Sequence, residues 1–325
     1  MTTPDIPRDG GGRTGRERHR EAAPTPRPPR TVTPGSTPSI SAGELWFPLT
    51  PAEIRALVRL ALDEDGAFND LTTIATVQSD RHARATLVAR EDGVIAGVPL
   101  AIEVFRQVDP KVSIRIDVED GTAVHAGQTV LFLSGHARAL LSAERVALNF
   151  MQRLSGIATL TSRFVALTSD TSARILDTRK TTPGWRRLEK YGVRAGGGVN
   201  HRFDLATAVL IKDNHLAALD GDVVVAVQRA RELAPPGMPV EVECDRLDQV
   251  RAALDAGADI ILLDNMSPAD MREAVRMAQG RAKLEASGGV TLATVRAIAE
   301  TGVDRISIGA LTHSPPALDL ALEFS

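Results

Sequence analysis

Cysteine and lysine are both scarce in this sequence. The 325 residues include one cysteine, Cys244, and a single thiol excludes an internal disulfide framework and any metal site built from several cysteines. We expect Cys244 to be a small buried thiol. Only five of the 38 basic residues are lysines, at positions 111, 180, 190, 212 and 283. Because a compact ammonium and a planar guanidinium suit different chemistry, the position of each lysine is worth noting.

Long apolar runs and a strong net charge are also missing. No apolar run approaches the roughly 20 residues that span a bilayer, and the N-terminus has no signal-peptide core. The formal charge of −3 and the pI of about 6.2 provide no overall attraction to nucleic acid or to anionic membranes. We therefore expect a cytoplasmic protein with neither partner, and any anionic ligand has to be bound by local charges.

The chain divides into three parts by composition. Residues 1–45 are rich in Pro, Gly, Arg, Ser and Thr without apolar periodicity, which predicts a disordered tail; a basic arm that contacts nucleic acid is the alternative. Residues 46–150 have α+β character, with a helix that begins at Pro51 behind the N-cap residue Thr50. A long amphipathic helix follows the turn-rich stretch "EDGTAVHAGQTVLFLSG". Residues 151–313 form the third part, and residues 314–325 are expected to pack back on the second.

Strands and helices alternate regularly after about residue 170. Short apolar runs such as "ARILDT", "AVLIKD", "PVEVEC" and "DIILLD" are separated by helical stretches, a pattern typical of a parallel sheet covered by helices. About six such units, with no Gly-x-Gly-x-x-Gly after the first strand, favour a barrel-like closure. An open doubly wound sheet would show the same alternation.

Polar residues or glycines follow each of these apolar runs. In a parallel α/β barrel the carboxyl ends of the strands meet at one face, so we expect these groups to share one site. The groups at the six strand ends are Asp177 to Lys180, Lys212 to His215, Glu243, Asp264 and Asn265, Ser287 to Gly289, and Gly309 with Ala310.

These groups, together with His201 and Arg202 from the connection before the second strand, fall into three chemical classes. The cations Arg179, Lys180, His201, Arg202 and Lys212 suit carboxylates or phosphates. The acids Glu243 and Asp264 suit hydroxyl groups or Mg²⁺. The glycine turns "SGG" and "GAL" leave backbone N–H groups for a terminal phosphate. A glycosyl phosphate combines all three kinds of group.

A long connection separates the first two of these strands. It contains three consecutive glycines at positions 196–198, and connections of this length in a compact domain are often functional. We expect Arg186, Arg187 and Lys190 to form a solvated helix face, whereas His201 and Arg202 come just before the second strand and close to the site.

Several ordered motifs together resemble quinolinate phosphoribosyltransferase, the carboxylating nicotinate-nucleotide pyrophosphorylase of NAD biosynthesis. They are "LDTRKTTPGWRRLEKYGVRAGGGVNHRFDL", "LIKDNH", "EVEC", "LLDNM", "EASGGV" and "TGVDRISIGALTHS", and the resemblance runs from Leu45 to the C-terminus. It implies an α/β fold with an N-terminal α/β sandwich domain and a C-terminal incomplete, open α/β barrel. It also implies a homodimer with shared active sites. The implied reaction joins quinolinate to 5-phosphoribosyl-1-diphosphate with Mg²⁺ and yields nicotinate mononucleotide, carbon dioxide and pyrophosphate.

The resemblance also implies roles for individual residues. Arg179, His201, Arg202 and Lys212 would bind the two quinolinate carboxylates, and Arg145 of "SAERVALNF" would reach the same ligand across the dimer. Lys180 would face the diphosphate beside Thr178, and Glu243 and Asp264 would face the ribose hydroxyls and the metal. The 5-phosphate would be held by Ser287, Gly288, Gly289, Ile308, Gly309 and Ala310, with His313 nearby or in a packing role. Of these, Lys180, Lys212, Glu243 and Asp264 are the predicted catalytic residues.

Two competing hypotheses remain. A related phosphoribosyltransferase acting on nicotinate or another ring with one carboxylate should need fewer cations than this set. A biotinyl or lipoyl carrier would explain "EDGTAVHAGQTVLFLSG", but such a carrier presents a modifiable lysine at a hairpin tip, and the sequence has no lysine between Lys111 and Lys180.

Overall fold

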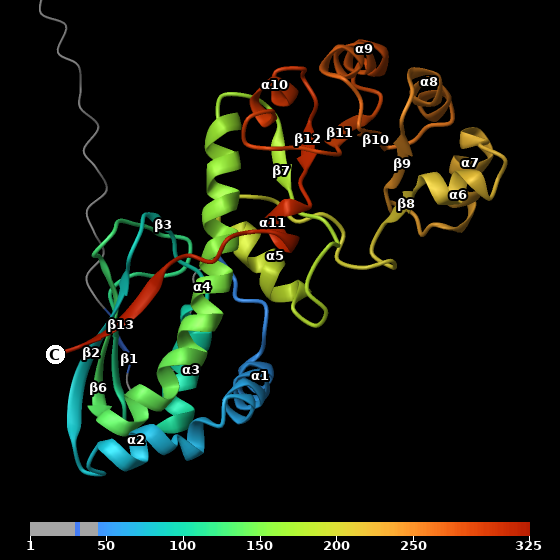
Figure 1. Cartoon of the computed structure of the whole chain (residues 1–325). Helices are drawn as coiled ribbons and strands as arrows, with labels where there is room; N and C mark the ends of the chain where they lie inside the picture. The colour runs from blue at the N-terminus through green and yellow to red at the C-terminus, as the bar shows by residue number, and fades with distance from the viewer. Residues whose placement is uncertain (1–29, 33–44) are drawn as a thin grey trace, which may run out of the picture.

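The computed structural model describes residues 30–32 and 45–325 and shows two parts that share one long helix (Figure 1). The first is an antiparallel sheet with the strand order β1-β4-β6-β2-β13. Its strands are β1 (Arg30–Val32), β2 (His82–Ala89), β4 (Ser113–Ile116), β6 (Thr129–His136) and β13 (Leu320–Phe324). A two-stranded sheet joins β3 (Gly93–Val94) to β5 (Ala123–Val124). The last strand of the chain therefore completes the first sheet.

Three helices accompany this sheet, and the first and the third of them bury an apolar face. They are α1 (Pro51–Glu64), α2 (Leu71–Thr76) and α3 (Val98–Val108), with a 3-10 turn η1 (Ala67–Asn69) between the first two. The prediction for the start of α1 is confirmed: the Thr50 hydroxyl accepts from the N–H of Glu53, and the Glu53 side chain accepts from the N–H of Thr50.

The segment expected to be disordered contains one described element. Arg30–Val32 form β1, which pairs with β4, so the expectation is wrong for these three residues: an unpaired edge of β4 is available for backbone hydrogen bonding. Residues 1–29 and 33–44, the rest of that prediction apart from Leu45, lie outside the described residues.

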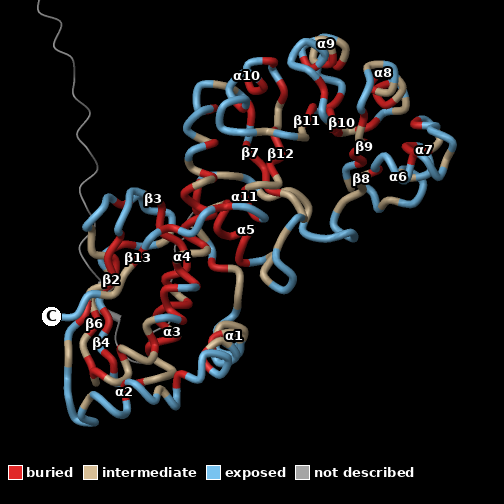
Figure 2. The backbone as a smooth tube through the Cα atoms, in the orientation of Figure 1, coloured by how far each residue is buried: buried red, intermediate tan, exposed pale blue. Residues whose placement is uncertain are grey.

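The helix α4 (Ala137–Thr168) is 32 residues long and belongs to both parts. It runs through position 150, where we placed a boundary, and its buried positions continue along its length (Figure 2). Gly156 allows the C-terminal chain to cross closely, because a Cβ atom there would lie 2.1 Å from the carbonyl oxygen of Pro316. The two parts are therefore built on one continuous support.

The second part is a six-stranded parallel sheet with the order β7-β12-β11-β10-β9-β8. The edge strands β7 and β8 are not paired with each other, which confirms the open barrel. Its strands are β7 (Arg174–Leu176), β8 (Val209–Ile211), β9 (Val240–Cys244), β10 (Ile260–Asp264), β11 (Lys283–Ser287) and β12 (Arg305–Ser307).

Helices flank the parallel sheet, and α7 to α10 follow one another along its outer side (Figure 1). They are α5 (Arg186–Ala195), α6 (Asp213–Ala217), α7 (Val223–Leu233), α8 (Leu247–Asp255), α9 (Pro268–Ala278), α10 (Val295–Ala299) and α11 (Ala310–His313). Cys244 is buried at the end of β9, as expected. Among the described helices, none combines the length and the apolar character needed to cross a bilayer.

Candidate active site

A cavity of about 860 Å³ opens at the carboxyl ends of the parallel strands. Residues from, or directly after, all six strands line it, as the convergence of strand ends in a parallel sheet requires. It brings together every predicted site residue except Arg145, namely Thr178, Arg179, Lys180, His201, Arg202, Lys212, Glu243, Asp264, Ser287, Gly288, Gly289, Ile308, Gly309, Ala310 and His313.

Two arginines form a concentrated positive charge in the cavity. The Nε atoms of Arg179 and Arg202 are buried, and neither has a hydrogen-bond partner among the described residues. Burial and then the charge of Arg179 lower the pKa of Arg202, so the two guanidinium groups oppose each other. Neighbouring like charges with buried, unpaired donor atoms are costly unless an anion offsets them. The arrangement is therefore suited to a ligand with more than one negative group.

Glu243 and Asp264 stand at the ends of neighbouring strands. Glu243 Oε2 accepts from Lys212 Nζ at 2.8 Å, and Asp264 Oδ2 accepts from the side-chain amide of Asn265 at 2.7 Å. These two carboxylates share the cavity with Lys180, whose side chain is exposed next to Gly309. The cavity is thus lined by two carboxylates and the Lys180 ammonium group together.

The turn after β11 requires glycine. Gly288 has φ of +93°, and a Cβ atom there would lie 2.1 Å from the Asn265 side-chain oxygen. The adjacent Gly289 has φ of +58° with open space around it. Backbone that turns in this way without side chains can present its N–H groups to an anion.

A buried ion pair holds the segment that presents His201 and Arg202 to the cavity. Lys190 Nζ donates to Asp177 Oδ1 and to the carbonyl oxygen of His201, and both side chains are fully buried. Asp177 also accepts from the His201 N–H at 2.8 Å and from the Asn200 amide at 2.6 Å. The expectation that Lys190 belongs to a solvated face is therefore wrong, because a carboxylate and a carbonyl from distant segments enclose its ammonium group.

The other two residues of that predicted face stay nearer to solvent. Arg187 is exposed and pairs with Glu53 of α1, whereas Arg186 is half-buried and donates to the Phe203 carbonyl oxygen at 3.1 Å. A further buried acid, Glu189, accepts from Arg153 at 2.6 Å and from the Thr182 hydroxyl at 2.8 Å. This contact ties the turn after Lys180 to α4 and α5.

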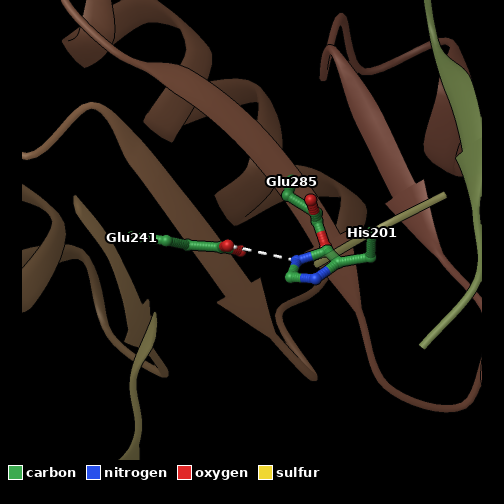
Figure 3. A group of neighbouring side chains, drawn as sticks. All are labelled: His201, Glu241 and Glu285. Carbon is green, nitrogen blue, oxygen red and sulfur yellow. Dashed lines mark ion pairs between the residues drawn. The ribbon is translucent and has the colours of Figure 1, made fainter. Parts of the chain in front are cut away.

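Two glutamates that the sequence analysis missed converge on His201 (Figure 3). His201 Nε2 lies 3.1 Å from Glu241 Oε2 and 3.5 Å from Glu285 Oε1. Both carboxyl groups are buried, and three of their oxygens have no hydrogen-bond partner among the described residues. Burial, and then the charge of Glu241, raise the pKa of Glu285 to about 7. The sequence did contain a signal for both: each is a charged residue within a short run that otherwise predicts a buried strand.

The imidazole has one proton placed by its contacts. The Arg202 N–H donates to His201 Nδ1 at 2.8 Å, so the ring proton lies on Nε2 and points to Glu241. Burial lowers the pKa of His201, but Glu241 and Glu285 outweigh it, so that the pKa is raised overall. A second proton, on Nδ1, would point at the N–H of Arg202 and is disfavoured by that contact. These three side chains are close enough to enclose a metal ion, with ligand atoms within 4.8 Å. However, a metal ion would need the Nε2 lone pair, and that nitrogen holds the proton.

Arg145 lies apart from the cavity. It is exposed on α4, among residues that pack against the first part of the chain. None of the residues that line the cavity belongs to α4. The structure thus places this predicted ligand group outside the site formed by the same chain.

Comparisons with known proteins agree over most of the chain. The model of the quinolinate phosphoribosyl transferase N-terminal domain matches residues 70–155, and that of the C-terminal domain matches residues 157–323. The chain is 46% identical over 275 residues to the nicotinate-nucleotide pyrophosphorylase [carboxylating] of Mycobacterium leprae, covering 83% of this chain and 96% of that protein. It is 43% identical over 271 residues to the probable Bacillus subtilis enzyme of that name, covering 83% and 93% of the two chains.

A solved structure has the same arrangement. The nicotinate-nucleotide pyrophosphorylase from Francisella tularensis superposes with a TM-score of 0.80 at 41% identity, covering 86% of this chain and 99% of that one. Both domain models, the close relatives and the shared fold lead to one conclusion: the chain belongs to the quinolinate phosphoribosyltransferase family.

Proposed function

We propose that this protein is a quinolinate phosphoribosyltransferase, which converts quinolinate and 5-phosphoribosyl-1-diphosphate to nicotinate mononucleotide, carbon dioxide and pyrophosphate. The observation that carries this proposal is the pair of half-buried arginines Arg179 and Arg202, whose Nε atoms are buried without a hydrogen-bond partner among the described residues. Quinolinate has two adjacent carboxylates and can offset both charges. Nicotinate, with one carboxylate, would leave one of them uncompensated.

The cavity fits displacement at the anomeric carbon of the ribose. The ring nitrogen of quinolinate attacks this carbon while the diphosphate departs, so the positive charge that develops on the ribose and the negative charge on the leaving group are what the site has to stabilise. Lys180 would meet the diphosphate, and the glycine turn at Gly288 would hold the 5-phosphate. No side-chain nucleophile is needed, and burial raises the pKa of the Cys244 thiol to about 12, which keeps it inert.

A Mg²⁺ ion is consistent with the acids in the cavity. Mg²⁺ binds carboxylate oxygens and is often held by one or two carboxylates together with substrate phosphates. Glu243 and Asp264 supply such oxygens at the rim that Lys180 shares. When bound there, the ion would neutralise charge on the diphosphate.

We also propose that the active unit is a homodimer. Arg145 is exposed and does not line the cavity of its own chain, so a partner subunit's copy would supply the additional cation for quinolinate. A cytoplasmic location and the lack of nucleic acid or membrane partners stay predictions from composition.

Two measurements test the proposal. The purified protein should release carbon dioxide and pyrophosphate in equal amounts from quinolinate and 5-phosphoribosyl-1-diphosphate. Isothermal titration should show tighter binding of quinolinate than of nicotinate, and preferential binding of nicotinate would contradict the assignment.

A further inference from the structure

The proposed reaction needs one proton that neither substrate provides. After the N–C bond to ribose has formed and pyrophosphate has left, the bond from ring carbon C2 to its carboxylate breaks. Carbon dioxide departs and the electron pair stays on C2. The product carries hydrogen at that carbon, so an acid in the cavity has to donate a proton to C2 and then regain one from solvent.

Most of the cavity's polar groups are unsuited to this task. Arg179 and Arg202 do not release protons near neutral pH. Lys212 is engaged by Glu243, and the His201 ring proton on Nε2 is directed to Glu241. Among the carboxyl groups that line the cavity, Glu285 is the one whose side chain is fully buried.

Glu285 has the geometry of an unused proton donor. It lies in the middle of β11, two residues before Ser287 and on the same face of the strand, so it points into the barrel below the glycine turn. Its side chain is fully buried, and no hydrogen bond to its carboxyl oxygens meets the distance and angle limits among the described residues; the nearest nitrogen is His201 Nε2, 3.5 Å from Oε1. A buried carboxylate with so few donors near it is disfavoured relative to the neutral carboxylic acid.

The groups facing Glu285 come from three elements. His201 approaches from the long connection, Glu241 from β9, and Arg305 with Ser307 from β12. The negative charge of Glu241 and the burial of the site favour the protonated form, and His201, Ser307 and Arg305 act in the opposite direction. The balance leaves the acid form substantially populated near neutral pH.

We propose that Glu285 is the acid that protonates C2 of the pyridine ring after carbon dioxide has left, and that His201 is a positioning residue held between Glu241 and Glu285. This inference rests on the proposed function. It separates the two halves of the reaction: the cations and the phosphate turn act in phosphoribosyl transfer, and Glu285 completes the decarboxylation. Without the acid, the anion at C2 can only recapture carbon dioxide or wait for water.

Single-turnover kinetics of Glu285→Gln test this role, because the amide preserves shape but is not an acid. Pyrophosphate should appear at a rate within a few-fold of the unsubstituted protein, whereas nicotinate mononucleotide should form about 10²- to 10⁴-fold more slowly, the usual range for general acid catalysis. Equal slowing of both products would overturn the proposal, and so would unchanged formation of both. In the unsubstituted protein, product formation should also fall as the pH rises above about 7, and this fall should be absent from the variant.

Two controls keep the outcome interpretable. If Glu285→Gln fails to fold, as judged by circular dichroism, Glu285→Asp retains an acid on a shorter side chain and should keep the pH dependence with a slower protonation step. An Asp variant without that pH dependence would count against the role. Failure of the proposed function is distinct, because the unsubstituted protein would then release neither pyrophosphate nor carbon dioxide from quinolinate.

Discussion

The ammonium group of Lys190 and the carboxylate of Asp177 form an ion pair that is fully closed to solvent beneath the cavity. Burial raises the pKa of Asp177 and lowers that of Lys190, and the attraction between the two groups opposes both shifts. Because the same two groups bond to the backbone of His201, the pair positions the segment that presents His201 and Arg202.

We expect Lys190→Met to lower the free energy of unfolding by roughly 3–5 kcal/mol, because it leaves a buried carboxylate without its partner. Urea unfolding measures the change. Lys283→Met is the matched control: that lysine pairs with Asp304 while 63% exposed, and its loss should cost less than about 1 kcal/mol. Similar losses in both variants would contradict the structural role of the buried pair.

Lys180→Ala and Arg179→Ala should each lower turnover by orders of magnitude and leave the fold intact. Both side chains line the cavity, and neither residue belongs to the buried core. Steady-state kinetics with both substrates, alongside melting temperatures, provide the check. Lys111→Ala, an exposed lysine in the first part of the chain, should leave turnover unchanged. Near-normal turnover of either cavity variant would refute the site.

Gly288→Ala should raise the KM for 5-phosphoribosyl-1-diphosphate by at least tenfold. The added Cβ atom would meet the Asn265 side chain at 2.1 Å and force the turn after β11 to move. Gly280→Ala carries a comparable backbone strain, at φ of +78°, but with nothing within 4 Å. If both variants bind the substrate equally well, the turn does not hold the phosphate.

Glu285 should make stability depend on pH in a defined direction. Its pKa is about 7 in the folded protein against an ordinary value of 4.5, so the folded state binds this proton more tightly. The free energy of unfolding should then decrease as the pH rises from about 4.5 through 7, by a total on the order of 3 kcal/mol from this group. Glu285→Gln should lose that decrease in urea titrations at successive pH values. An unchanged pH profile would mean that Glu285 is ionised throughout.

The strand ends could be predicted from the sequence, and the interior of the barrel could not. Glu243 and Ser287 were found because they follow apolar runs. Glu241 and Glu285 stand two residues earlier on the same strands and share the inward face, since side chains alternate along a strand. The residue two positions before each strand-end residue faces the same way, and this alternation alone would predict both glutamates.

Lys190 shows why the buried charged residues of α5 could not be predicted from the sequence. The segment "RRLEKYGVRA" is strongly polar, which is typical of an exposed helix, yet it buries Glu189 and Lys190. Their partners, Arg153 and Asp177, come from α4 and from the end of β7. The burial of a charge depends on groups that folding brings from elsewhere, and local pattern does not contain that information.

The pairing of β13 with β2 affects the order in which the chain can fold on the ribosome. β2 pairs with β6 on one side early in synthesis, but its other edge waits for Leu320–Phe324, which are made more than 200 residues later. Until then that edge offers unpaired backbone groups to any neighbouring chain. The newly made N-terminal sheet is therefore the part of this enzyme on which a chaperone, or an aggregating neighbour, can act for longest.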